Sequence, residues 1–152
     1  MLNSIYGSEW IGYLEPERNK TIFADMVYKK YGINFQGIPW CVVFIFAVHP
    51  KASKLGKPCS GINSLIKKAV LRFRWRGRSY APKPGDLLFL RGDKNEIASH
   101  VEIVEDFDGD YITSIGGNAI DMSNHYPPEY GGAVTERFRD IQDNKIIGFC
   151  KM

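Results

Sequence analysis

The spacing of apolar residues changes once along this chain, at residues 82–86, and this change constrains the fold more than any other feature. Before the Pro-Lys-Pro-Gly-Asp segment, apolar residues recur at three- and four-residue intervals, which is typical of helices. After it they form short runs that are typical of strands, at 87–90, 100–104, 111–115 and 146–150. The sequence therefore predicts an α+β fold with N-terminal helices packed on a C-terminal antiparallel sheet.

Three helices are expected before the change. Residues 18–31 have an amphipathic pattern that ends at Gly32, and residues 61–71 have a second one. The apolar run 42–48 fits either a buried strand or a helix that is buried all round. Pro39 suits the approach to a helix N-terminus, so we expect a helix there.

One hairpin can be placed by its turn. The segment 106–110 contains Gly109, which can take a positive φ, between two apolar runs. Pairing across this turn would bring His100 close to residues 116–118. The sheet therefore brings side chains distant in sequence to one end of a hairpin.

Length and composition limit the organisation and the partners. With 152 residues, 44% of them hydrophobic, the chain is expected to form one domain over 1–152, and nothing in it requires more than a monomer. A net charge of +3 suits an anionic polymer. The Arg- and aromatic-rich segment 72–78 resembles a stacking surface for nucleic acid, but we expect a solvated rim and no nucleic-acid partner. No apolar run reaches the length of a membrane span, so no transmembrane segment is expected.

The cysteine pattern argues against a disulfide scaffold and against a metal site. Cys41, Cys59 and Cys150 are odd in number and far apart, with no Cys-x-x-Cys pair. Cys59 and Cys150 are either core residues or a pair. The aspartates at 106, 108 and 110 lack the remaining ligand spacing of a calcium loop. We therefore expect no metal and no cofactor.

A thiol at a helix N-terminus near a histidine is favoured as a nucleophilic thiolate. Cys41 begins the predicted helix, His100 lies in a strand, and Asn118 falls near His100 across the hairpin. These residue types in this arrangement suggest a Cys-His-Asn triad, with Cys41 as nucleophile and His100 as general base. Taken alone, a cysteine in an apolar run such as Cys41 is more often an inert buried thiol.

Four segments together resemble the signature blocks of the CHAP family of papain-like hydrolases, in the family's order. These are Pro39-Trp-Cys-Val-Val-Phe-Ile, Pro84-Gly-Asp-Leu-Leu-Phe, Ser99-His-Val-Glu-Ile-Val and Gly109-Asp-Tyr-Ile-Thr-Ser-Ile-Gly-Gly-Asn. The resemblance covers roughly residues 20–120. It implies a papain-like α+β fold and a peptidoglycan amidase or endopeptidase, with Cys41, His100 and Asn118 in the catalytic positions.

The chain departs from the family pattern at two places. Many members have a glutamate two residues before the asparagine, where this chain has Gly116, so the orienting role would fall to Asn118. Glu102 stands two residues after His100, where the family usually has a small residue, and strand alternation puts both on one face. Glu102 is therefore a candidate for catalytic support, or else an exposed strand carboxylate. Gln36 is a candidate oxyanion donor.

The expected substrate is peptidoglycan, cut at the bond between N-acetylmuramic acid and L-alanine or within the peptide. Trp40, Trp75 and Tyr126 are candidates for lining the substrate groove. The N-terminus has no secretory pattern, so we expect synthesis in the cytoplasm and action on the wall after release or non-classical export. Two alternatives stay open: hydrolysis of another amide substrate, and an inactive wall-binding module, for which Gly116 is the best argument.

Overall fold

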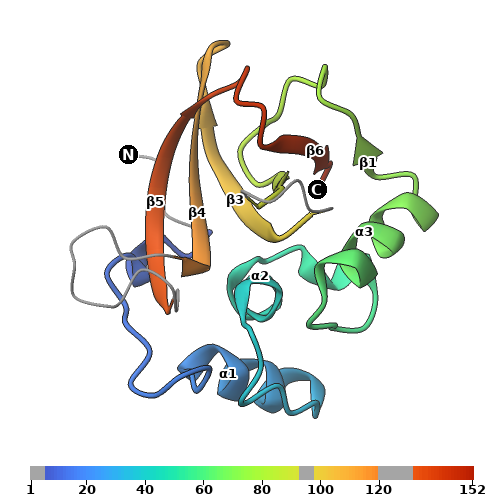
Figure 1. Ribbon diagram of the computed structural model, residues 1–152. Helices are drawn as coiled ribbons and strands as arrows, with labels where there is room; N and C mark the ends of the chain where they lie inside the picture. The colour runs from blue at the N-terminus through green and yellow to red at the C-terminus, as the bar shows by residue number, and fades with distance from the viewer. Residues whose placement is uncertain (1–5, 93–97, 120–131) are drawn as a thin grey trace.

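The computed structural model describes residues 6–92, 98–119 and 132–152 and has an α+β architecture (Figure 1). Its helices are α1 (Ile22–Tyr31), α2 (Cys41–Val48) and α3 (Ile62–Leu71), with two short 3-10 helices, η1 (Ser8–Trp10) and η2 (Ala52–Leu55). Its strands are β1 (Trp75–Arg76), β2 (Leu87–Leu90), β3 (His100–Phe107), β4 (Tyr111–Ala119), β5 (Ala133–Asp140) and β6 (Ile146–Cys150). They form one antiparallel sheet in the order β1-β6-β2-β3-β4-β5, which confirms the predicted fold class.

Helix α1 is shorter than its apolar pattern suggested because a side chain caps it. The Thr21 hydroxyl accepts a hydrogen bond of 3.2 Å from the backbone N–H of Ala24, so the helix begins at residue 22 rather than 18. It ends at Gly32, whose φ of 74° is the left-handed conformation that glycine takes readily. Both ends therefore follow from local chemistry.

The run 42–48 is a helix, as expected, and its position explains its composition. Helix α2 lies between α1 on one side and strands β3 and β4 on the other (Figure 1). Its residues from Cys41 to Phe46 are all buried. A helix covered on two sides has no solvent face, so it needs no polar stripe.

The sheet separates two apolar clusters. The larger one joins the helices to one face of the sheet and includes Phe23, Trp40, Phe44, Val101 and Ile115. The smaller one lies on the other face and comprises Leu88, Leu90, Val104, Ile112, Ile146 and Phe149. Alternation along each strand sends successive side chains to these two clusters.

The β3–β4 hairpin confirms the predicted turn and register. Gly109 has a φ of 107°, and Ile103 pairs with Ile115 across the two strands. Both strands run further than their apolar segments did. The register shifts between Gly116 and Ala119 in the pairing of β4 with β5, which marks a bulge at the end where the chemistry was expected.

Strand β5 was not predicted from the sequence. Its outer positions Glu136, Phe138 and Asp140 are exposed, while Thr135, Arg137 and Arg139 are partly buried. The strand therefore has no apolar alternation beyond its first two residues, because its inward-facing positions carry polar groups. No helix in the described part of the chain is long and apolar enough to cross a membrane.

Candidate active site

The start of α2 is fixed by a buried hydrogen bond. Trp40 is the N-cap residue, and its side chain is fully buried and stacked on Phe23 at 5.3 Å between ring centroids. Its indole Nε1 donates a 2.7 Å hydrogen bond to Oε2 of Glu15. Cys41 is the next residue and the first of the helix, at 6% exposure. The nucleophile candidate thus sits on a rigid support and has a small exposed area.

Cys41 and His100 border the same cleft, as the sequence predicted. The cleft has a volume of about 550 Å³. Its lining comprises Ile38, Pro39, Cys41, Ser60, Gly61, Ile62, Asn63, Ser64, Ala98, Ser99, His100 and Asn118. The helix N-terminus forms one wall and the start of β3 forms another. The start of α3 completes the cleft, a contribution that the sequence did not indicate.

Gly117 lets strand β4 approach the cysteine helix closely. A Cβ atom at this position would lie 2.6 Å from Cβ of Phe44 and 2.7 Å from Cζ3 of Trp40. Asn118 follows in the bulge with a φ of 53°, a conformation that non-glycine residues adopt at a cost. Its Oδ1 is buried and has no hydrogen-bond partner in the described residues. Asn118 lines the cleft, as predicted, but the contacts that the structure describes for the His100 imidazole are with other residues.

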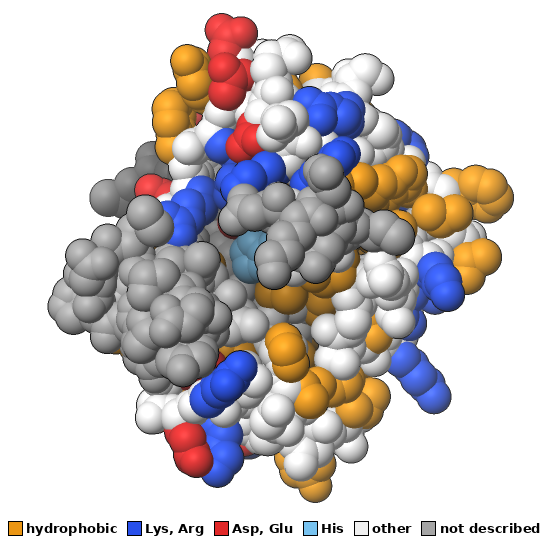
Figure 2. Space-filling model, in the orientation of Figure 1, with side chains coloured by type: hydrophobic (Ala, Val, Ile, Leu, Met, Phe, Trp, Pro, Cys, Tyr) orange, Lys and Arg blue, Asp and Glu red, His pale blue; other side chains and the backbone are white. Residues whose placement is uncertain are grey.

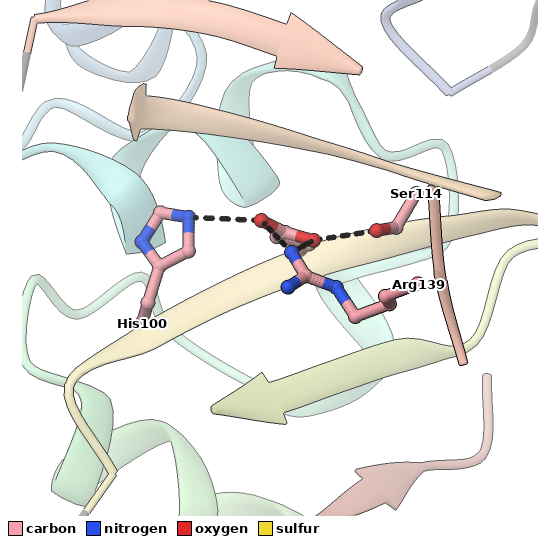
Figure 3. A network of polar contacts seen from close by, with 4 residues as sticks. His100, Ser114 and Arg139 are labelled. Carbon is pink, nitrogen blue, oxygen red and sulfur yellow. Dashed lines mark hydrogen bonds and ion pairs between the residues drawn. The ribbon is translucent and has the colours of Figure 1, made fainter. Parts of the chain in front are cut away.

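A buried carboxylate contacts the histidine on the face of β3 that both share (Figure 3). Oε1 of Glu102 lies 3.4 Å from Nε2 of His100, an ion-pair distance without hydrogen-bond geometry. Nη2 of Arg139 donates to both Glu102 oxygens, at 2.9 and 2.8 Å, and Oγ of Ser114 donates to Oε2 at 2.5 Å. Glu102 is 2% exposed. The alternative interpretation from the sequence, that Glu102 is an exposed strand carboxylate, is therefore wrong.

These contacts set the charges of the pair. Burial opposes protonation of His100, but the neighbouring Cys41 and the carboxylate of Glu102 outweigh burial and raise the pKa of His100 to about 10. Burial also opposes ionisation of Glu102, but His100, Arg139 and Ser114 outweigh it and lower the pKa of Glu102 to about 2. Imidazolium and carboxylate are therefore the neutral-pH forms.

A second cavity, of about 320 Å³, adjoins the cleft and shares His100 and Asn118 with it. Four basic residues line it, namely Arg91, Arg137, Arg139 and Lys145, and Glu102 is the single carboxylate among its lining residues. Figure 2 shows Lys and Arg side chains gathered beside the surface histidine. The lining of the cavity next to the imidazole is therefore mostly positively charged. No local sequence pattern indicated this cavity.

Two candidate residues from the sequence are placed where they cannot take the roles expected of them. Trp40 is fully buried, so its indole does not line a groove. Gln36 donates from Nε2 to the backbone oxygen of Thr21 at 2.7 Å and to Oδ1 of Asp25 at 2.9 Å. Its amide therefore supports the start of α1 and is not an oxyanion donor in this structure. No local sequence pattern indicated the burial of Trp40 or the hydrogen bonds of Gln36.

The remaining binding candidates also lie apart from the cleft or outside the described residues. Trp75 packs against Phe89, at 5.3 Å between ring centroids, and over Gly148, and it does not line either cavity beside His100. Nη1 of Arg74 donates to the backbone oxygen of Lys151 at 3.0 Å, a structural use of the basic segment. Tyr126 lies outside the described residues.

The three cysteines are free. Cys150 is buried, and burial raises the pKa of its thiol to about 12, whereas Cys59 is half-buried. Cys59 and Cys150 therefore do not form the pair that was one of two readings of the sequence. Among the residues that the structure describes, no group of three His, Cys, Asp or Glu side chains is arranged to hold a metal ion.

An α+β fold in which a cysteine begins a buried helix beside a strand-borne histidine defines the papain-like class of proteins. The family model of the CHAP domain matches residues 33–118, and the chain belongs to this family.

Solved structures give a partial likeness. The crystal structure of Ly7917 with the hydrolyzing product of MDP matches with 20% sequence identity and a TM-score of 0.36. This match covers 51% of the present chain and 31% of the Ly7917 chain. The crystal structure of Ly7917 without that product is 20% identical with a TM-score of 0.33, and covers 51% and 30%. The likeness thus spans under a third of the Ly7917 chain. No curated protein matches the sequence.

Proposed function

We propose that this protein is a cysteine-dependent hydrolase that cleaves amide bonds in peptidoglycan, with Cys41 as nucleophile and His100 as acid and base. The observation that carries the proposal is that Cys41 and His100 border one cleft, where Cys41 favours the protonated form of the imidazole. The bond cut is either that between N-acetylmuramic acid and L-alanine or one within the stem peptide or cross-bridge.

The proposed reaction uses Cys41 as the nucleophile and His100 as the proton donor and acceptor. The Cys41 thiolate attacks the amide carbonyl carbon, a C–S bond forms, and the carbonyl electron pair moves to oxygen. As the intermediate collapses, the C–N bond breaks and the His100 imidazolium gives its proton to the leaving amine. Water then attacks the thioester, His100 takes a proton from the water, and the C–S bond breaks to release the acid and the thiolate.

The developing oxyanion needs donors, and the start of α2 supplies one. The backbone N–H of Cys41 lies in the first turn, where a helix has no internal acceptor for it. Asn118, whose amide borders both cavities, is proposed to bind a polar group of the substrate at this point. This role replaces the orientation of His100 that the sequence suggested for Asn118.

The positive second cavity favours an acidic substrate. Stem peptides of peptidoglycan carry carboxylates, and Arg91, Arg137 and Lys145 surround the space next to the imidazole. Charged side chains of one sign lining a cleft raise the local concentration of a ligand of opposite sign. This observation supports peptidoglycan over an uncharged amide substrate. Cytoplasmic synthesis and later action on the wall stay predictions.

The test is clearing of purified peptidoglycan by the wild-type protein and by Cys41→Ala, followed by mass spectrometry of the fragments. We expect the wild type to clear the suspension and Cys41→Ala to fall to background, and the new end groups name the bond. Cys59→Ala is the matched control and should retain activity. Clearing by Cys41→Ala would refute the cysteine mechanism, and no clearing across several wall chemotypes would favour another amide substrate or a binding module.

A further inference from the structure

The carboxylate of Glu102 is held by groups from the next two strands of the sheet. Glu102 lies in β3, Ser114 in β4 and Arg139 in β5, and both partners donate hydrogen bonds to it (Figure 3). The register of an antiparallel sheet fixes the positions of these strands relative to one another. The carboxylate is therefore held in place beside His100 by the sheet itself.

The space around this carboxylate is available only because position 116 has no side chain. A Cβ atom on Gly116 would lie 2.8 Å from Cγ of Glu102 and 2.9 Å from Nε2 of His100. Gly116 is not among the residues with positive φ, so its backbone conformation does not require glycine. The glycine is needed here for space, and the side chains of Glu102 and His100 occupy that space.

The two departures from the family pattern thus occupy one place in the structure. A side chain at 116 would project from β4 toward Nε2 of His100, and the Glu102 side chain reaches the same atom from β3. Strand β3 carries both the histidine and this carboxylate, whereas β4 has no side chain at position 116. In this protein the carboxylate beside His100 therefore comes from β3.

We propose that Glu102 is the positioning residue that orients and charges His100 in this protein, that Arg139 holds it ionised, and that Gly116 provides the room it needs. This inference rests on the proposed function of His100. It assigns to Glu102 and Arg139 a role in the reaction, and it removes Gly116 as an argument for an inactive module.

The electrostatics of the surroundings agree with this assignment. Both Cys41 of α2 and Glu102 favour the protonated form of the imidazole. Four cations line the neighbouring cavity together with His100, namely Arg91, Arg137, Arg139 and Lys145. Among the described residues that line this cavity, Glu102 is the single carboxylate.

The first experiment follows His100 by NMR and needs no substrate. In a Cys41→Ala background, the imidazole is titrated with Glu102 present and with Glu102→Gln, and the His100 signal is assigned by its loss in His100→Gln. We expect the midpoint to fall by about 1–3 pH units in Glu102→Gln, as removal of a nearby opposite charge predicts. An unchanged midpoint in a folded Glu102→Gln protein would overturn the proposal.

The second experiment measures the reactivity of Cys41 with iodoacetamide, resolved by peptide mass spectrometry. Cys59 in the same molecule is the internal reference. Glu102→Gln and Arg139→Met should each slow alkylation of Cys41 at neutral pH, by about tenfold or more for Glu102→Gln, because a poorly protonated imidazole no longer stabilises the thiolate. Equal slowing of Cys59, or no slowing of Cys41, would contradict a positioning role.

The third experiment moves the carboxylate from β3 to β4. Glu102→Ala is compared with Glu102→Ala/Gly116→Glu, with circular dichroism to establish that both fold. We expect Cys41 to be alkylated at least tenfold faster in the double variant than in Glu102→Ala. A folded double variant no faster than Glu102→Ala would refute the equivalence of the two positions. Since neither alkylation nor NMR uses peptidoglycan, failure to clear walls would count against the proposed function alone.

Discussion

The indole of Trp40 donates a hydrogen bond to the carboxylate of Glu15 across 25 residues of sequence, at 2.7 Å and out of contact with solvent. Oε2 of Glu15 also accepts from the backbone N–H of Asn19 at 2.9 Å. The carboxylate therefore links the N-terminal segment to the residue immediately before Cys41. The position of Cys41 therefore depends on a contact remote from the cleft.

Replacing Trp40 with Phe should destabilise the fold and reduce activity. The change removes a hydrogen bond to a charged group and leaves a small cavity, at a cost of about 2–4 kcal/mol. Thermal denaturation of Trp40→Phe, Glu15→Gln and the double variant tests this as a cycle. We expect the two losses to be less than additive, because both substitutions weaken one interaction. Strict additivity would show that the contact contributes nothing.

The stability of the protein should depend on pH through His100 and Glu102. The pKa of His100 is raised, so its contribution is complete below its ordinary value of 6.5 and is lost as the pH rises toward about 10. The pKa of Glu102 is lowered, so its contribution is complete above its ordinary value of 4.5 and is lost as the pH falls toward about 2. We expect a plateau of Tm between 4.5 and 6.5 from this pair.

Thermal scans of the wild type and of Glu102→Gln from acid to alkaline pH measure this effect. The difference in Tm between the two proteins should be largest on the plateau and should shrink on both sides of it. Two curves that stay parallel at every pH would mean that the pair makes no pH-dependent contribution.

Gly117→Ala should destabilise the packing of α2 on the sheet. The added methyl group would lie 2.6 Å from Cβ of Phe44, in a backbone conformation that alanine can adopt. Overpacking of this kind costs about 1–3 kcal/mol. Gly77→Ala is the control, because a Cβ atom there has no neighbour within 4 Å. The prediction fails if urea denaturation gives the same free energy of unfolding for both variants.

Reversing one charge in the second cavity should weaken the binding of an acidic substrate. Lys145 is exposed and lines that cavity, so Lys145→Glu should raise KM by several-fold at low salt and leave kcat nearly unchanged. High salt should narrow the difference between the variant and the wild type because it screens exposed charges. Lys54→Glu, an exposed site in η2, is the control and should leave KM unchanged. An equal effect of both substitutions would indicate net charge rather than a local site.

The predicted elements were those whose local pattern was complete. Helix α1 and the β3–β4 hairpin carry their own boundary signals, at Gly32 and Gly109. Strand β5 carries no apolar stripe to reveal it, because Arg139 faces inward and is neutralised by Glu102. A buried ion pair between distant strands leaves no periodic trace in the sequence. The missed strand and the missed partner of Glu102 therefore have one cause.

The sequence by itself determined the order of helices and strands, the helix start at Cys41 and the hairpin that brings residue 116 close to His100. These features follow from backbone propensities and apolar spacing within short segments. The tertiary structure alone decided which polar groups meet: Glu102 beside His100, Trp40 buried against Glu15, and Gln36 bound to the start of α1. The reason is physical, since a polar side chain satisfies its hydrogen bonds with whichever partner the packed chain brings within 3 Å, however distant in sequence.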